Sequence, residues 1–340
     1  MHLRFAFFIV ILFLIQCRQP QPSMFNGNTM GTSYMVKIAD RSLNAEQLAH
    51  LKKQIDDTLQ QVNQQMSTYI EDSEISRFNR HQSNDGFKVS PGFTAVLKTA
   101  IQAHEASQGA FDPTVAPLVN LWGFGPGEKR PTLPSRSEII DMKKSMGMHH
   151  LKIVNDSVII KTDPHLHLDL NAIAKGYGVD VVSGLLQRKG YQNFLVEIGG
   201  EVVVKGRKGN AKWRIAVDKP SMDAIHGQDI QSVLTLTDMA MATSGDYRNF
   251  FMHNDTLYSH TIDPRTGRPV SNGVASATVL AEYCIKADAI ATALMVMGVQ
   301  KGLAWIEQTD DTEAMLITRK GETYKTHMSS GFEKYVVKRQ

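Results

Sequence analysis

The segment Ser259–Asp263 places three chemically active side chains within five residues: a hydroxyl, an imidazole and a carboxylate. Pro264 and Gly267 follow, and this spacing is typical of a tight turn, because proline fixes φ and glycine tolerates positive φ. A histidine held at a strand-to-turn corner can accept a proton near neutral pH, so His260 is a candidate general base. The alternative is a polar turn in which His260 only caps a backbone group. Asp263 would either orient His260 or cap the turn, and we favour the turn.

A second candidate site lies in the apolar run 287–294. Asp288 and Thr292 are four positions apart, so they share one face of a helix. A carboxylate and a hydroxyl are oxygen ligands that suit a hard cation such as Mg²⁺. The alternative is that Asp288 is a helix N-cap and Thr292 bonds back to its own helix.

A third candidate is the junction between an expected strand over 165–170 and a helix that runs to about Lys189. Small residues and Lys175 lie there, and the free N–H groups of a helix start favour phosphate. Neither G-x-x-x-x-G-K-[ST] nor G-x-G-x-x-G occurs, so neither a P-loop nor a Rossmann dinucleotide site is expected. His165 and His167 share one strand face and could bind a metal, but no third ligand of that type is evident. We expect a solvent-facing pair.

Hydrophobic periodicity and capping residues predict the elements that position these candidates. A helix is expected over 44–66, with Asn44 as its N-cap and Gln47 in the capping-box position. Further helices are expected from Ser90-Pro91, from Ser135 or Ser137, over 286–298 and over 302–308. Strands are expected from Tyr34 onward, on both sides of Asn155-Asp156 and on both sides of Gly199-Gly200.

The composition is that of a globular protein. The chain has 340 residues, 42% of them hydrophobic and 21% charged, and its formal net charge is +3. This length can bury a large core in one big domain or in two intimate ones. Acids and bases are mixed without a basic block, which argues against binding to nucleic acid. Cys284 lies in an apolar run and is expected to be a small buried hydrophobe.

Residues 1–17 have the features of a bacterial lipoprotein signal. Arg4 precedes an apolar run over 5–15, which is too short to span a bilayer as a helix. Cys17 follows directly in an L-x-x-C setting, so we expect it to be acylated and to become the mature first residue, with a polar tether over 18–23. The protein would then be exported and lipid-anchored on the periplasmic side of the inner membrane. The alternatives are a simple secretory signal and an uncleaved short anchor.

Seven stretches, in the same order, resemble the ApbE-type flavin transferases (FAD:protein FMN transferases) over about residues 24–335. They are T-M-G-T at 29–32, D-S-E-I-S-R-F-N at 72–79, G-A-F-D-P-T-V at 109–115, D-L-x-x-I-A-K-G-Y at 169–177, E-x-G-G-E at 197–201, S-H-x-I-D-P-x-T-G at 259–267 and A-D-A at 287–289. The resemblance implies an α+β fold. Mixed or antiparallel sheets and helices would pack in two intimately associated halves, with FAD in the cleft between them.

The resemblance also implies the roles of individual residues. Mg²⁺ would sit on the Ala172 carbonyl, Asp288 and Thr292, and His260 would be the base near the attacking hydroxyl. The residues implied to contact FAD are Met30 and Tyr69 on its flanks, Ala110, Phe111 and Asp112 along it, and Asp169, Lys175 and Ile262.

The implied reaction is attack by a Ser or Thr hydroxyl on the FMN phosphorus of FAD, which expels AMP. The acceptor would be an exported or membrane flavoprotein with a Ser/Thr-Gly-Ala-Ser/Thr-like site, which we do not find in this chain. Two alternatives use the same residues. One is a Mg²⁺-dependent FAD pyrophosphatase with water as acceptor, giving FMN and AMP. The other is a flavin-binding lipoprotein without turnover, against which the retained His260, Asp288, Thr292 and Lys175 argue. Sequence does not separate transferase from hydrolase, because the acceptor is a separate protein.

Overall fold

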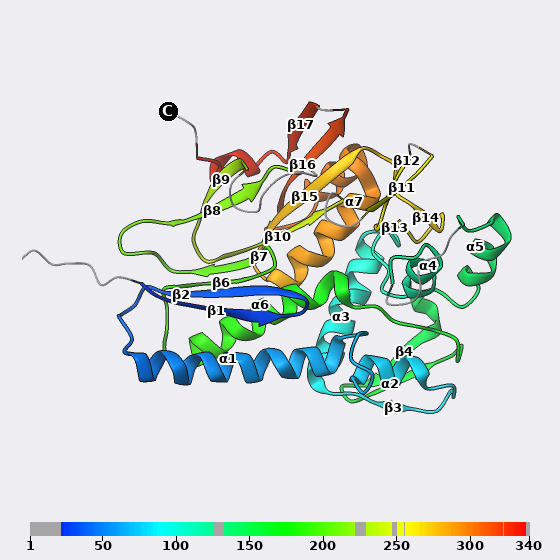
Figure 1. The fold of residues 1–340 in the computed structure, drawn as a ribbon, viewed down its shortest axis with the longest axis horizontal. Coiled ribbons are helices and arrows are strands. Elements are labelled where there is room, and N and C mark those ends of the chain that lie inside the picture. The colour runs from blue at the N-terminus through cyan, green and yellow to red at the C-terminus, as the bar shows by residue number, and fades with distance from the viewer. Residues whose placement is uncertain are drawn as a thin grey trace, which may run out of the picture.

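The computed structural model describes residues 22–125, 132–221, 229–246, 250–254, 256–321 and 323–337 (Figure 1). Cys17 and the signal segment lie outside these residues. Ser23, the last residue of the expected tether, is the first residue of strand β1 (Ser23–Thr29). Its buried hydroxyl accepts a hydrogen bond of 2.8 Å from the Leu43 N–H, so the chain is fixed to the fold from this point.

An eight-stranded sheet forms the centre of the molecule, and each neighbouring pair of its strands is antiparallel. In spatial order the strands are β1, β2 (Thr32–Ile38), β6 (Phe194–Ile198), β7 (Glu201–Lys205), β10 (Met239–Gly245), β15 (Val274–Ala281), β16 (Glu313–Lys320) and β17 (Thr323–Met328). The β1–β2 turn consists of Met30 and Gly31, with φ of 49° and 70°. Positive φ at both central residues is the type I′ hairpin turn.

Three long helices cover one face of this sheet: α1 (Ala45–Met66), α6 (Asn171–Arg188) and α7 (Cys284–Ile306) (Figure 1). Small residues let α7 approach the strands closely, among them Ala242, Ala277, Ala281, Ala287 and Ala291, all fully buried. The opposite face packs against the ribbon of β8 (Trp213–Asp218) and β9 (Ile230–Leu236) and the short helix at Phe332–Tyr335. The sheet is therefore buried on both faces.

A second half packs beside α6 and α7 (Figure 1). Its helices are α2 (Glu74–Arg80) and α3 (Pro91–Ala106), and its sheet has the order β3 (Phe87–Lys88), β5 (Val158–Lys161), β4 (Leu151–Asn155), with a short helical turn at Met148–His150 before β4. A smaller cluster beside it contains α4 (Ala116–Leu121), α5 (Arg136–Lys143) and the hairpins β11 (Phe250–His253)–β12 (Thr256–Ser259) and β13 (Ile262–Asp263)–β14 (Arg268–Pro269). The predicted α+β fold with two closely packed halves is confirmed.

The local signals for helix starts are confirmed. Asn44 and Gln47 form the predicted capping box of α1. Ser90 caps α3 with Pro91 in its first turn, and Ser135 caps α5. The hairpin β4–β5 forms around residues 155–156, and β6 and β7 pair across Gly199-Gly200.

The expected strand over 165–170 is not present as a strand. The alternation is real, because Leu166, Leu168 and Leu170 are fully buried while His165 and His167 are exposed, as predicted. No neighbouring strand completes a ladder there among the described residues. Instead, the Asn79 amide donates to the Leu168 carbonyl at 2.9 Å and accepts from its N–H at 2.8 Å.

Helix α7 combines the two helices predicted for its segment and has a break at Gly298, which has φ 76° and ψ 176°. Asn272 donates to the carbonyls of Met295 and Val296 next to the break. By length and composition α7 is apolar enough to cross a membrane, but it is packed here against the sheet and α6. Its hydrophobicity is thus explained by its place in the core.

Candidate active site

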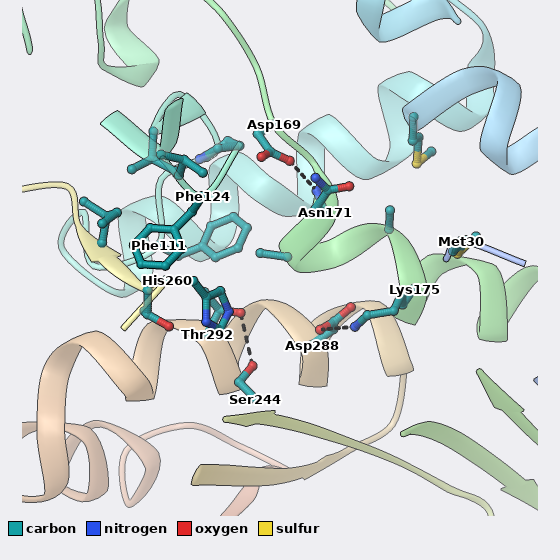
Figure 2. Close-up of a pocket in the computed structure, with 18 of the residues that line it drawn as sticks. Met30, Phe111, Phe124, Asp169, Asn171, Lys175, Ser244, His260, Asp288 and Thr292 are labelled. Atoms are coloured by element: carbon teal, nitrogen blue, oxygen red, sulfur yellow. Dashed lines mark hydrogen bonds and ion pairs between the residues drawn. The ribbon is translucent and has the colours of Figure 1, made fainter. Parts of the chain in front are cut away.

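A cleft of about 910 Å³ lies between the two halves, within the size range of ligand pockets. All residues assigned from the sequence to the flavin, the cation and the general base line it. They are Met30, Tyr69, Ala110, Phe111, Asp112, Asp169, Ala172, Lys175, His260, Ile262, Asp288 and Thr292. Figure 2 shows many of these side chains converging from α6, α7 and the loops around them. The fold therefore brings together residues that are up to 262 positions apart (292 − 30).

Gly176 allows α6 and α7 to touch. Its N–H donates to Asp288 Oδ2 at 2.9 Å. A Cβ at position 176 would lie 2.5 Å from the Cys284 carbonyl oxygen and 2.8 Å from the Asp288 Cβ, so no other residue fits without movement of a helix. The close approach places Asp288 at the start of α6.

Asp180 fixes the start of α7 from the same side. Its two carboxylate oxygens accept hydrogen bonds of 2.9 Å from the N–H groups of Cys284 and Ile285, the first two residues of α7. Burial raises the pKa of Asp180 to about 6, although the two N–H bonds oppose this. A carboxylate at a helix N-terminus also interacts favourably with the helix dipole. Asp180 and Gly176 together hold α7 against α6.

The Gly176 bond also affects the Ala172 carbonyl. In a regular α-helix the N–H of residue 176 bonds the carbonyl of residue 172. This N–H donates to Asp288, and a carbonyl oxygen has two lone pairs, so the Ala172 carbonyl has capacity for another partner. Ala172 lines the cleft, and a carbonyl oxygen is chemically suited to a hard cation.

Asp288 and Thr292 face the same part of the cleft. Asp288 lies inside α7, whose N-cap is Tyr283, so the alternative of an Asp288 N-cap is excluded. Thr292 Oγ1 lies 3.3 Å from Ser244 Oγ, a contact across to β10 (Figure 2). With Ala172, these residues form an all-oxygen donor set with one carboxylate, which fits Mg²⁺, an ion that usually keeps waters and substrate phosphates as its other ligands. Within the described part of the chain, no group of three or more His, Cys, Asp or Glu side chains is placed to hold a metal.

Lys175 places a positively charged ammonium group at the floor of the cleft. Its Nζ lies 2.9 Å from Glu201 Oε1 and 3.9 Å from Asp288 Oδ1. Burial opposes the charged form of Lys175, but the Asp288 and Glu201 carboxylates outweigh burial and raise its pKa. Lys175 therefore remains positively charged beside the two acids, and its side chain is still 31% exposed.

His260 lies between β12 and β13, half-buried at the wall of the cleft. The Phe124 ring meets its imidazole edge-on, with 6.4 Å between the ring centroids. Ser259 Oγ accepts the Thr261 N–H at 3.1 Å. These contacts hold the backbone on both sides of the imidazole.

The turn after His260 is held from two sides. Asp263 accepts hydrogen bonds of 2.9 Å from the N–H and the Nε of Arg265, so its carboxylate caps the turn, as favoured from the sequence. The buried Trp122 indole donates to the Gly267 carbonyl at 2.9 Å and stacks on Tyr258. Trp122 thus connects α4 to the turn.

The remaining cleft residues form an apolar wall with two acids. Phe111, Ala110 and Ile262 are buried, whereas Tyr69 is 69% exposed at the surface. The Asp112 carboxylate accepts from the N–H and hydroxyl of Thr114, and Asp169 accepts from the Asn171 N–H at 2.8 Å. Burial raises the pKa of Asp169.

The chain is similar to known proteins over most of its length. The model of the ApbE family matches residues 30–316. The chain belongs to the ApbE family. Over 330 aligned positions it is 42% identical to the FAD:protein FMN transferase of Vibrio cholerae, covering 96% of this chain and 97% of that protein. It is 35% identical over 347 positions to the FAD:protein FMN transferase of Escherichia coli K12, covering 98% and 97%.

Solved structures of ApbE proteins have the same fold. The flavin transferase ApbE from Vibrio cholerae superposes with a TM-score of 0.82 at 42% identity, covering 93% of this chain and 99% of that one. The flavinyl transferase ApbE from Pseudomonas stutzeri, in its apo form, gives 0.84 at 36% identity, covering 94% and 98%.

The sequence assigned no role to several residues in or beside this cleft. Glu201 stood in a recognised stretch, but its ion pair with Lys175 joins β7 to α6. The same holds for the contacts of four other residues, which also join elements far apart in the sequence: Asp180, Trp122, Phe124 and Ser244. The only local signal for Glu201 is an acid that directly follows two glycines between two apolar runs.

Proposed function

We propose that this ApbE-family protein carries out the Mg²⁺-dependent transfer of the FMN moiety of FAD to a Ser or Thr hydroxyl of another protein. The products are a phosphoester-linked flavin and AMP. The observation that carries the proposal is a cleft in which His260, Lys175 and the oxygen donors of α6 and α7 lie next to an apolar wall. Transfer of this group is the activity named for the relatives.

The apolar wall supports binding of the flavin ring. Met30, Phe111 and Ile262 provide an apolar surface, and burial against such a surface favours binding of an aromatic ring. Tyr69 at the exposed edge offers a ring face for stacking. This wall would orient the ring and leave the pyrophosphate over the floor of the cleft.

The floor supports binding of the pyrophosphate. Lys175 supplies a positive charge, and the start of α6 supplies the positive end of the helix dipole. Mg²⁺ held by the Ala172 carbonyl, Asp288 and Thr292 would neutralise charge on the phosphate oxygens as AMP leaves. These residues bind and align the phosphates so that the FMN phosphorus faces His260.

His260 would take the proton of the attacking hydroxyl. The bond from the acceptor oxygen to the FMN phosphorus forms as the bond from that phosphorus to the AMP oxygen breaks. Proton removal by a positioned base typically accelerates a reaction by about 10²–10⁴-fold. The Trp122 and Asp263 contacts keep the His260 backbone in place during this step.

The acceptor and the location are also part of the proposal. The signal-like segment before Cys17 supports an exported, lipid-anchored protein, and an acceptor on the same side of the membrane with a Ser/Thr-Gly-Ala-Ser/Thr-like site.

The test is mass spectrometry of a small acceptor protein that contains a Ser-Gly-Ala-Thr site. The acceptor is incubated with FAD, Mg²⁺ and the protein lacking residues up to Cys17. We expect the acceptor to gain the mass of one FMN while AMP appears in equal amount, and His260→Ala to abolish both. His253→Ala is the matched control, because this histidine lies on the preceding hairpin and does not line the cleft. FMN and AMP with an unmodified acceptor would favour the pyrophosphatase, and intact FAD would contradict both enzymes.

A further inference from the structure

Glu201 has an unusual environment at the cleft. It is 1% exposed, and its Oε1 pairs with Lys175 at 2.9 Å. Its other oxygen, Oε2, is buried and makes no hydrogen bond within the described structure. An unsatisfied buried carboxylate oxygen is costly, so Glu201 depends on Lys175 for most of its stabilisation.

Asp288 competes for the same ammonium group. Its Oδ1 is 3.9 Å from Lys175 Nζ, whereas its Oδ2 accepts the Gly176 N–H. Lys175 therefore lies between two acids, one of which is a proposed cation ligand. A shift of about 1 Å by the ammonium would place it in direct contact with Asp288, where it would repel a divalent cation and occupy the ligand oxygen.

We propose that Glu201 is a positioning residue that keeps Lys175 off Asp288, so that the Asp288 carboxylate stays available to the divalent cation. The inference rests on the proposed function for the cation at Asp288. The fold gives Glu201 a fixed place for this role, because Glu201 is the first residue of β7 and follows directly on the Gly199-Gly200 turn. The role also accounts for the unpartnered oxygen, because a second donor on Glu201 would weaken its hold on Lys175.

The test uses two substitutions that separate position from charge. Glu201→Gln removes the charge, and Glu201→Asp keeps the charge but shortens the side chain by one methylene, so that it no longer reaches Lys175. If Glu201 holds Lys175 in place through a charged contact at this distance, both variants bind a divalent cation more weakly. If only its charge matters, Glu201→Asp binds like the unaltered protein.

The experiment measures the binding of Mn²⁺ to the FAD-free protein. The concentration of unbound Mn²⁺ is determined by electron paramagnetic resonance. Mn²⁺ takes the same hard oxygen ligands as Mg²⁺. We expect the Kd of both Glu201 variants to rise about tenfold or more. Lys175→Met added to Glu201→Asp should restore binding, because it removes the displaced ammonium, whereas a merely deformed site would not recover. Glu74→Gln is the control, since it alters another buried carboxylate that does not line the cleft.

A Kd within twofold of the unaltered protein for Glu201→Asp would overturn the positioning role, and so would a failure of Lys175→Met to restore binding. These results differ from a failure of the proposed function. If the unaltered protein bound no Mn²⁺ and transferred FMN in the presence of a chelator, the cation site itself would be wrong, and the inference with it.

Discussion

The contact between α6 and α7 can be perturbed at a single atom by Gly176→Ala. The new Cβ would lie 2.5 Å from the Cys284 carbonyl oxygen and 2.8 Å from the Asp288 Cβ. Ordinary contacts begin at 3.4 Å, so the two helices must separate by roughly 1 Å. The separation would stretch the Gly176–Asp288 hydrogen bond and move Ala172 away from Asp288 and Thr292.

The expected cost is small in stability and large in activity. Overpacking costs about 1–3 kcal/mol, and the better helix propensity of alanine returns about 1 kcal/mol. The net loss of about 0–2 kcal/mol would lower the Tm by a few degrees. A displacement of about 1 Å between reacting groups can reduce the rate by about 10²-fold. We therefore expect the rate of FMN transfer to fall about a hundredfold in a folded protein.

The assay is the initial rate of FMN attachment by mass spectrometry, together with thermal unfolding followed by circular dichroism. Gly184→Ala is the matched control, because it lies on the same helix and its Cβ would meet only the end of the Arg188 side chain. It should keep its activity and gain up to about 1 kcal/mol. Transfer by Gly176→Ala within twofold of the unaltered protein would refute the reasoning, and so would equal losses in both variants.

Three further predictions concern the wall, the cation and the core. Trp122→Phe removes the indole bond to the Gly267 carbonyl, so we expect about 1–2 kcal/mol less stability in urea and a kcat about tenfold lower, with the KM for FAD nearly unchanged; an unchanged kcat would contradict the positioning of His260 by this bond. Asp288→Asn should lower transfer about a hundredfold, with partial recovery as Mg²⁺ is raised in steady-state assays, and recovery without added Mg²⁺ would be inconsistent with a ligand role. Burial lowers the pKa of Lys161 from 10.5 to about 8, so between these values the unfolded chain binds more protons and stability rises with pH. Urea unfolding at pH 7.5 to 10.5 should show the free energy of unfolding rise by about 1–3 kcal/mol, and Lys161→Met should abolish this rise. A rise that persists in the variant would have to come from another titrating group.

Local signals in the sequence were sufficient for several helix starts and for the pairing of Asp288 with Thr292 on one helix face, whereas most residues of the cleft came from the family resemblance. The Asn44 and Gln47 capping box and the spacing of Asp288 and Thr292 depend on neighbours within one or two turns, so a single sequence contains them. The family resemblance supplied the grouping of distant stretches into one cleft, which neither periodicity nor spacing could have supplied.

Interactions between distant elements were not predictable in the same way. The Lys175–Glu201 pair depends on β7 lying beside α6, and the Gly176 contact depends on the distance between two helices. The expected strand at 165–170 was wrong for a related reason. Alternating leucines show which side is buried, but they do not show that the Asn79 side chain, rather than a strand, pairs with the backbone.

The central claim, that a protein hydroxyl attacks the FMN phosphorus of FAD, is tested most directly by running the reaction in ¹⁸O-labelled water with an acceptor protein present. Mass spectra of the acceptor and of the nucleotide products would be recorded. We predict an acceptor that carries unlabelled FMN and an equal amount of unlabelled AMP, because no water oxygen enters either phosphate. Free FMN with one ¹⁸O and an unmodified acceptor would contradict the account, since water would then be the nucleophile.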